Sequence, residues 1–151
     1  MGARFWAAGS AVSGVATTLA LVAPTLNVND IIIAQISSQD NDAVATPDST
    51  WTSINELNNG TGLRSSLFWK RAVTGSSGAT FTFTGLAGTT SNMGILTAYR
   101  GCKADNSPIG SVTSSANVSA DAVTYATLTP TSNLSAIIAA GFYADNATTA
   151  G

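Results

Sequence analysis

The stretch Thr80-Phe81-Thr82-Phe83-Thr84 is the clearest structural signal in this chain of 151 residues. Polar and apolar side chains alternate along it, and successive side chains of a β-strand point to opposite faces of a sheet. We therefore predict a strand here, with Phe81 and Phe83 facing a core and the threonines facing solvent or a second layer. Such a strand belongs to a sheet that has a buried face.

Strand signals continue on both sides of this stretch, whereas helix signals are nearly absent. The run Ile31-Ile32-Ile33-Ala34-Gln35-Ile36 is typical of a strand buried on both faces. In residues 64–73, alternation places Leu67, Trp69 and Arg71 on one face and Phe68, Lys70 and Ala72 on the other. Strands are predicted at residues 17–22, 31–36, 51–54, 64–73, 80–84, 93–99, 123–128 and 135–143, with at most a weak strand around Val112.

This spacing of strands and turns predicts the fold class. Turn residues that tolerate positive φ separate the strands, as at Asn58–Gly62 and Gly75–Gly78. The pattern favours an all-β protein, an antiparallel β-sandwich of jelly-roll-like form with about nine short strands. We expect an N-terminal arm at residues 1–14 and a single β-sandwich domain at residues 15–151. Deleting the arm is expected to abolish assembly and to leave the fold intact.

The composition argues against catalysis. The chain has no histidine, one cysteine and 9% charged residues. Ser-His-Asp and Cys-His arrangements are thereby excluded, and Cys102 is interpreted as a buried small hydrophobe. We expect no enzymatic activity and no cofactor.

The same composition bears on partners and on location. A formal net charge of −2 gives no electrostatic reason to expect a nucleic acid as partner. The apolar run at residues 17–22 is too short to span a membrane, and small polar residues interrupt the N-terminal stretch where a signal peptide would have its apolar region. We therefore expect a protein made in the cytoplasm with neither a membrane partner nor an export signal.

Two groups of residues are candidates for a site. Asp40 and Asp42, with Asp48, form the acidic cluster that would suit Ca²⁺, but the spacing lacks the glycine and the distal glutamate of a calcium loop. A solvated turn is the interpretation that we favour, so no metal is assigned. The second group consists of aromatic residues that could form a subunit interface or a sugar-stacking platform, although aromatic residues in strands more often belong to a core. Its members are Phe5, Trp6, Trp51, Trp69 and Tyr99.

Several segments together resemble a known family. They are Asn29-Asp30-Ile31-Ile32-Ile33-Ala34, Thr46-Pro47 with Trp51-Thr52-Ser53-Ile54, Ser66-Leu67-Phe68-Trp69-Lys70-Arg71-Ala72, Ala79-Thr80-Phe81-Thr82-Phe83, and Gly94-Ile95-Leu96-Thr97-Ala98-Tyr99-Arg100-Gly101 with Pro108-Ile109. The series resembles a β-sandwich module of bacteriophage virion structural proteins that is also seen in bacterial surface proteins. The resemblance covers residues 27–143, and its motifs are structural rather than catalytic.

The chain departs from the module in two places. Asn29 stands where the module usually has glycine, and the module usually continues past its last strand with a further segment containing proline and glycine. A sandwich without its last strand would leave an open edge, and open edges pair with neighbours.

The resemblance implies a virion structural protein, a capsid decoration or cement protein or a tail-associated protein that acts through contacts between subunits. Its partners would be copies of itself and other virion proteins, and its location would be the virion. The first alternative is a carbohydrate-binding or host-adhesion module with a surface glycan as partner. The second alternative is a filament-forming surface protein.

Overall fold

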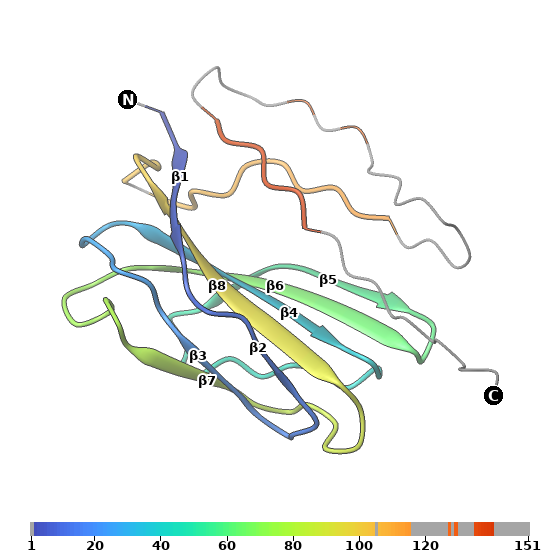
Figure 1. The fold of residues 1–151 in the computed structure, drawn as a ribbon. Coiled ribbons are helices and arrows are strands. Elements are labelled where there is room, and N and C mark those ends of the chain that lie inside the picture. The colour runs from blue at the N-terminus through green and yellow to red at the C-terminus, as the bar shows by residue number, and fades with distance from the viewer. Residues whose placement is uncertain (1, 105, 116–126, 128, 130–134, 141–151) are drawn as a thin grey trace.

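The computed structural model describes residues 2–104, 106–115, 127, 129 and 135–140. These residues form eight β-strands and contain no helix, so none of them belongs to a helix that could span a membrane. The strands form two antiparallel sheets packed together as an all-β sandwich, which confirms the predicted class (Figure 1). Their bounds are β1 Arg4–Ala8, β2 Val12–Gly14, β3 Leu19–Val22, β4 Ile31–Ser38, β5 Thr52–Asn59, β6 Leu63–Arg71, β7 Thr80–Phe83 and β8 Asn92–Arg100.

The larger sheet has six strands in the order β1-β8-β4-β6-β5, with β2 also paired to β8. Its central strand β4 is antiparallel to both neighbours, with Ile33 opposite Trp69 on β6 and opposite Thr97 on β8. The first four residues of β4 are all buried, as the apolar run predicts for a strand covered on both faces. The smaller sheet contains β3 and β7.

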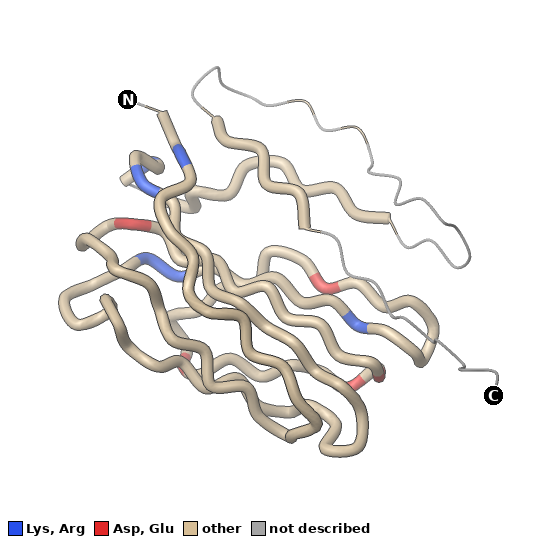
Figure 2. The backbone as a smooth tube through the Cα atoms, in the orientation of Figure 1, with Lys and Arg blue, Asp and Glu red and all other residues tan. Residues whose placement is uncertain are grey.

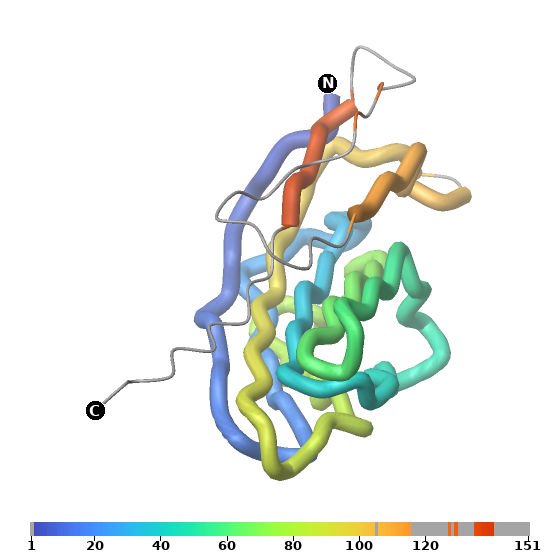
Figure 3. Tube along the Cα trace, turned by 90° about the vertical axis from the view of Figure 1, so that its right-hand side faces the viewer, coloured from blue at the N-terminus to red at the C-terminus, as the bar shows by residue number. Residues whose placement is uncertain are grey.

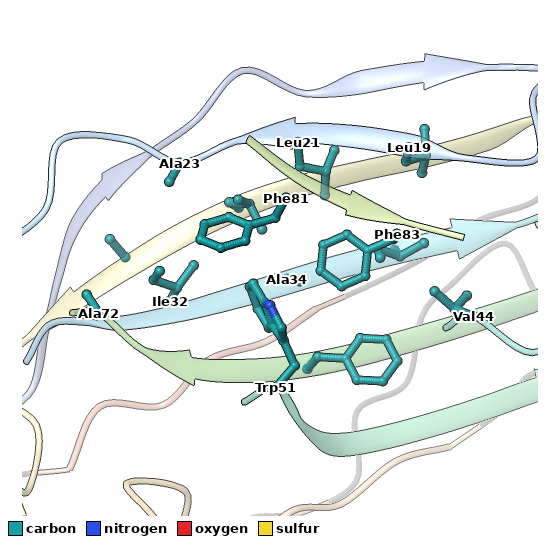
Figure 4. Close-up of a cluster of buried hydrophobic side chains, with 14 of the residues drawn as sticks. Leu19, Leu21, Ala23, Ile32, Ala34, Val44, Trp51, Ala72, Phe81 and Phe83 are labelled. Carbon is teal, nitrogen blue, oxygen red and sulfur yellow. The ribbon is translucent and has the colours of Figure 1, made fainter. Parts of the chain in front are cut away.

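The main core lies between the two sheets. Phe81 and Phe83 of β7 point into it while the neighbouring threonines are exposed, which confirms the predicted alternation. Trp51 contacts both phenylalanines edge to face, with ring centroids 5.2 and 5.1 Å apart (Figure 4). Phe68 of β6 stacks on Phe83 from the larger sheet at 6.0 Å. The aromatic residues therefore join the sheets directly.

A second, smaller cluster lies on the opposite face of the larger sheet. Ile31, Ile33 and Tyr99 are buried there, and Trp69 and Cys102 pack against them. The described parts of the C-terminal region, residues 106–115 and 135–140, lie on this side in Figure 1, away from β3 and β7. The larger sheet thus has apolar side chains on both faces.

The N-terminal segment differs from the expected arm. Residues 4–8 and 12–14 form β1 and β2, which pair with the two halves of β8 in the same chain (Figure 3). The edge of β8 that β4 does not use offers main-chain hydrogen bonds along its whole length, and residues 4–14 take them up. The chain turns at Gly9, whose amide donates to the Leu96 carbonyl at 2.8 Å. Residues 4–8 and 12–14 are therefore part of the larger sheet.

Predicted strands in the C-terminal region have different outcomes. The strand at 123–128 lies, but for Thr127, outside the described residues. The described part of the strand expected at 135–143, residues 135–140, has no strand geometry, and neither do residues 111–115 around Val112. Ile137 is 62% exposed, so the burial that strand patterning implies is not achieved there.

Candidate assembly surface

Strand β1 displays two large aromatic side chains at the edge of the larger sheet. Phe5 is 57% exposed and Trp6 is 43% exposed. Phe5 lies opposite Tyr99 and Ala7 opposite Ala98, so Trp6 is an extra residue in the ladder and forms a β-bulge. A bulge changes the direction in which a side chain points. Here Phe5 packs on one face of the sheet and Trp6 lies over Arg100.

Contacts from Trp6 to Arg100 and from Arg100 to Asp30 fix the position of the Trp6 side chain. The Arg100 guanidinium lies 3.6 Å from the centroid of the Trp6 ring. Its Nε and Nη2 donate to the two carboxylate oxygens of Asp30 at 2.8 and 2.7 Å, a bidentate pair. Asp30 is only 3% exposed, and its carboxylate also accepts the Asn27 amide at 2.8 Å. The exposed indole is thus anchored through Arg100 to a buried carboxylate.

Asp30 and Arg100 each shift the pKa of the other in the direction that favours its charged form. The hydrogen bond from Arg100 lowers the pKa of Asp30 below its ordinary value, against the opposing effect of burial, and the Asn27 amide lowers it further. The same hydrogen bond raises the pKa of Arg100. Both groups are therefore charged at neutral pH, and the stacking surface under Trp6 is cationic.

Phe5 connects the edge strand to the second apolar cluster. Its ring meets Tyr99 edge to face at 5.9 Å, and Tyr99 is buried beside Ile31 and Ile33. Trp69 packs against the same cluster and is half-buried. Phe5, Trp69 and Tyr99 therefore share the outer face of the larger sheet, whereas Trp6 does not.

Trp51 lies apart from the other candidate aromatics. It is 6% exposed and belongs to the core between the sheets. The Lys70 ammonium lies 6.0 Å from its ring and pairs with Asp48 at 3.2 Å. Stacking of a sugar on Trp51 would require opening the core, so Trp51 has a structural role in core packing.

The three candidate calcium ligands do not converge. Asp40 accepts hydrogen bonds from Ser38 Oγ at 2.6 Å, from Thr90 Oγ1 at 2.8 Å and from the Asp42 amide at 2.7 Å. Burial alone would raise the pKa of Asp40, but these bonds and one from the Ala87 amide hold it below its ordinary value. Asp48 faces Lys70 and Thr50 instead. Among the described residues, no three acidic, histidine or cysteine side chains come together as metal ligands would.

The ion pair of Asp30 and Arg100 was not predicted from the sequence. The signal that points to it is positional: Asp30 immediately precedes β4, Arg100 ends β8, and the two strands are antiparallel neighbours. Because Ile31 is opposite Tyr99, the residue before Ile31 and the residue after Tyr99, Asp30 and Arg100, meet at the same end of the sheet. This pairing of strands is a property of the fold rather than of either segment.

Comparison with family models, with curated proteins and with solved structures finds no significant match to this chain.

Proposed function

We propose that this chain is a virion structural protein, a capsid decoration or tail-associated subunit that acts through contacts between copies. The observation that carries the proposal is the exposed aromatic edge strand β1, in which Phe5 and Trp6 are 57% and 43% exposed. Anchored, exposed tryptophan and arginine side chains are typical of the residues that dominate binding at protein interfaces. The resemblance to the phage module supports the virion as the setting.

The core of the module is consistent with a structural role. Trp51, Phe81 and Phe83, which belong to the segments that carry the resemblance, pack against one another between the sheets. Asp30 and Arg100, from two other such segments, form a bidentate ion pair. The motifs thus build the fold, and surfaces outside the core are left to bind partners.

The first test is the mass of the purified full chain by light scattering over a wide range of concentrations. A discrete oligomer or a growing polymer supports the proposal, because burial of β1 against another copy removes apolar surface from water. A monomer at every concentration contradicts self-association.

A carbohydrate-binding or host-adhesion module is the second candidate, and the exposed ring of Trp6 favours it. Aromatic rings of this kind stack on the faces of sugars. Binding of the chain to a panel of immobilised glycans, lost in Trp6→Ala and retained in Val22→Ala, would support this candidate. Equal signals from both variants would contradict it.

A further inference from the structure

We propose that two copies of this chain pair through strand β1, edge to edge and antiparallel, so that their larger sheets join into one continuous sheet. The partner of β1 is β1 of the second copy, and a two-fold axis relates the two copies. This inference rests on the proposed function, because it names the contact through which copies associate.

Strand β1 lies at one edge of the larger sheet. It is first in the strand order and pairs with β8 alone, and among the described residues no strand pairs with its other side. The main-chain groups on the outer side of an edge strand are not used by the sheet itself, and another extended strand offers complementary groups at the same spacing. The outer side of β1 therefore has room for one further strand.

The side chains of β1 favour an apolar partner. The strand has one charged residue, at its first position, and no other charge along its length (Figure 2). Phe5 and Trp6 are 57% and 43% exposed, and two alanines follow them. Strand β5, at the opposite edge of the same sheet, has three asparagines, a glutamate, a threonine and a serine among its eight residues. A second copy of β1 matches this apolar edge, whereas the polar β5 does not.

A two-fold axis perpendicular to the sheet pairs the two strands antiparallel and keeps both faces of the joined sheet continuous. Full overlap of the five residues places Trp6 opposite Trp6 of the second copy, and Phe5 opposite Ala7 of the second copy. Aromatic side chains paired across strands in this way stabilise a sheet. Because both copies use the same edge, the contact is closed and ends at a dimer.

Both aromatic side chains are held in place before a partner binds. The Trp6 ring lies over Arg100 at 3.6 Å, and Phe5 meets Tyr99 edge to face at 5.9 Å. Side chains that are already fixed lose little freedom on association. About 100 Å² of each ring is exposed, so two copies supply about 400 Å² of aromatic surface. The β-bulge at Trp6 keeps the paired stretch short, and we therefore expect a small, reversible interface.

The first test asks whether Trp6 lies on the two-fold axis. Trp6→Cys and the control Val73→Cys are each made with Cys102→Ser, so that each chain has one thiol. Val73 is 59% exposed and lies in the turn after β6. Opposed residues of antiparallel strands have Cα atoms about 4.5–5.5 Å apart, within reach of a disulfide. We expect Trp6→Cys to form covalent dimers at least about tenfold faster than Val73→Cys under mild oxidation, measured by non-reducing electrophoresis.

The second test leaves both aromatic rings in place. Ala8→Lys adds a lysine to the exposed edge, which is a substitution that blocks the pairing of edge strands. Thr82→Lys is the matched control, because Thr82 is exposed on β7 of the smaller sheet. Circular dichroism and thermal unfolding verify that all variants fold. By analytical ultracentrifugation we expect the wild type and Thr82→Lys to dimerise alike, and Ala8→Lys to lose about tenfold or more in association constant.

Different failures overturn different statements. If the wild type assembles and Ala8→Lys assembles equally well, or if Trp6→Cys cross-links no faster than Val73→Cys, pairing through β1 is overturned and the assembly function stands. Preferential cross-linking of Trp6→Cys to Asn55→Cys, on β5, in an equal mixture would overturn the two-fold dimer in favour of a growing sheet. If the wild type is monomeric at every concentration, the proposed function is contradicted together with this inference.

Discussion

Asn29 has a backbone φ of 74°, in the left-handed region that glycine adopts without strain. It occupies the turn before β4, where its amide donates to the Ala72 carbonyl at 2.9 Å. This is the position at which the resembling module has glycine, and the geometry explains why either residue serves there. Asparagine is the common substitute because it tolerates this conformation better than other residues with a side chain.

Replacing Asn29 therefore tests the turn directly. We expect Asn29→Ala to lower the free energy of unfolding by about 1 kcal/mol, because alanine is strained at this φ. Asn29→Gly should be as stable as the wild type or more stable. Urea denaturation followed by tryptophan fluorescence measures both, and equal destabilisation by alanine and by glycine would argue against backbone strain as the cause.

Gly9 is required by a close approach rather than by its φ. A Cβ placed there would lie 2.3 Å from the carbonyl oxygen of Val22. We expect Gly9→Ala to cost roughly 1–3 kcal/mol of stability, as overpacking does elsewhere. Gly14→Ala is the control, since a Cβ at Gly14 meets nothing within 4 Å. The idea fails if the two variants have the same midpoint of thermal unfolding.

The ion pair of Asp30 and Arg100 predicts how stability depends on pH. The pKa of Asp30 is lowered in the folded protein, so its contribution to stability is present above the ordinary carboxyl pKa of about 4. That contribution is lost as the pH falls through the lower pKa of the folded state. Between pH 6 and pH 2, the midpoint of thermal unfolding of Asp30→Asn should fall less steeply than that of the wild type. Parallel curves would mean that Asp30 does not contribute to acid unfolding.

At the scale of elements, β1 and β2 belong to the fold and do not form a detachable arm. They occupy the edge of β8 at seven paired positions, four in β1 and three in β2. Each lost ladder hydrogen bond is worth about 0.5–1.5 kcal/mol net, and Val12 also packs against the main core. The N-terminal segment therefore contributes to stability as well as to the surface.

Deletion of residues 1–14 should consequently destabilise the protein, contrary to the expectation from the sequence. We expect a large fall in the midpoint of thermal unfolding, whereas Trp6→Ala should cause only a small one. Differential scanning calorimetry of the two variants separates these effects. If the deletion variant unfolds at the temperature of the wild type, the pairing of β1 and β2 with β8 contributes little.

At the scale of the whole molecule, nearly every strand pairs with a partner distant in sequence. β4 pairs with β8, with Ile31 opposite Tyr99, and β3 pairs with β7, with Leu21 opposite Phe81. Loops must close before such contacts form, so proteins of this kind fold slowly. We expect refolding in milliseconds to seconds, measured by stopped-flow fluorescence. Refolding within microseconds would contradict this dependence on distant pairing.

Several features of this fold follow from local sequence pattern alone. The alternation of Phe81 and Phe83 with threonines determines which side of β7 is buried, and the apolar run at residues 31–34 determines that β4 is central. These predictions succeed because the direction of a side chain depends on the period of its own strand. The composition likewise excludes Ser-His-Asp and Cys-His arrangements, because the chain has no histidine.

Other features were decided only when the chain folded. Residues 4–14 show no clear strand alternation, and they form strands because β8 has an unused edge beside them. The sequence does not distinguish the role of Trp51 from that of Trp6. In the fold, Trp51 lies in the core, whereas a β-bulge places Trp6 over Arg100. The ion pair beneath Trp6 joins residues 70 positions apart, which meet because two antiparallel strands end together. Local pattern determines which face of a strand is apolar, whereas the pairing of distant strands determines what that face contacts.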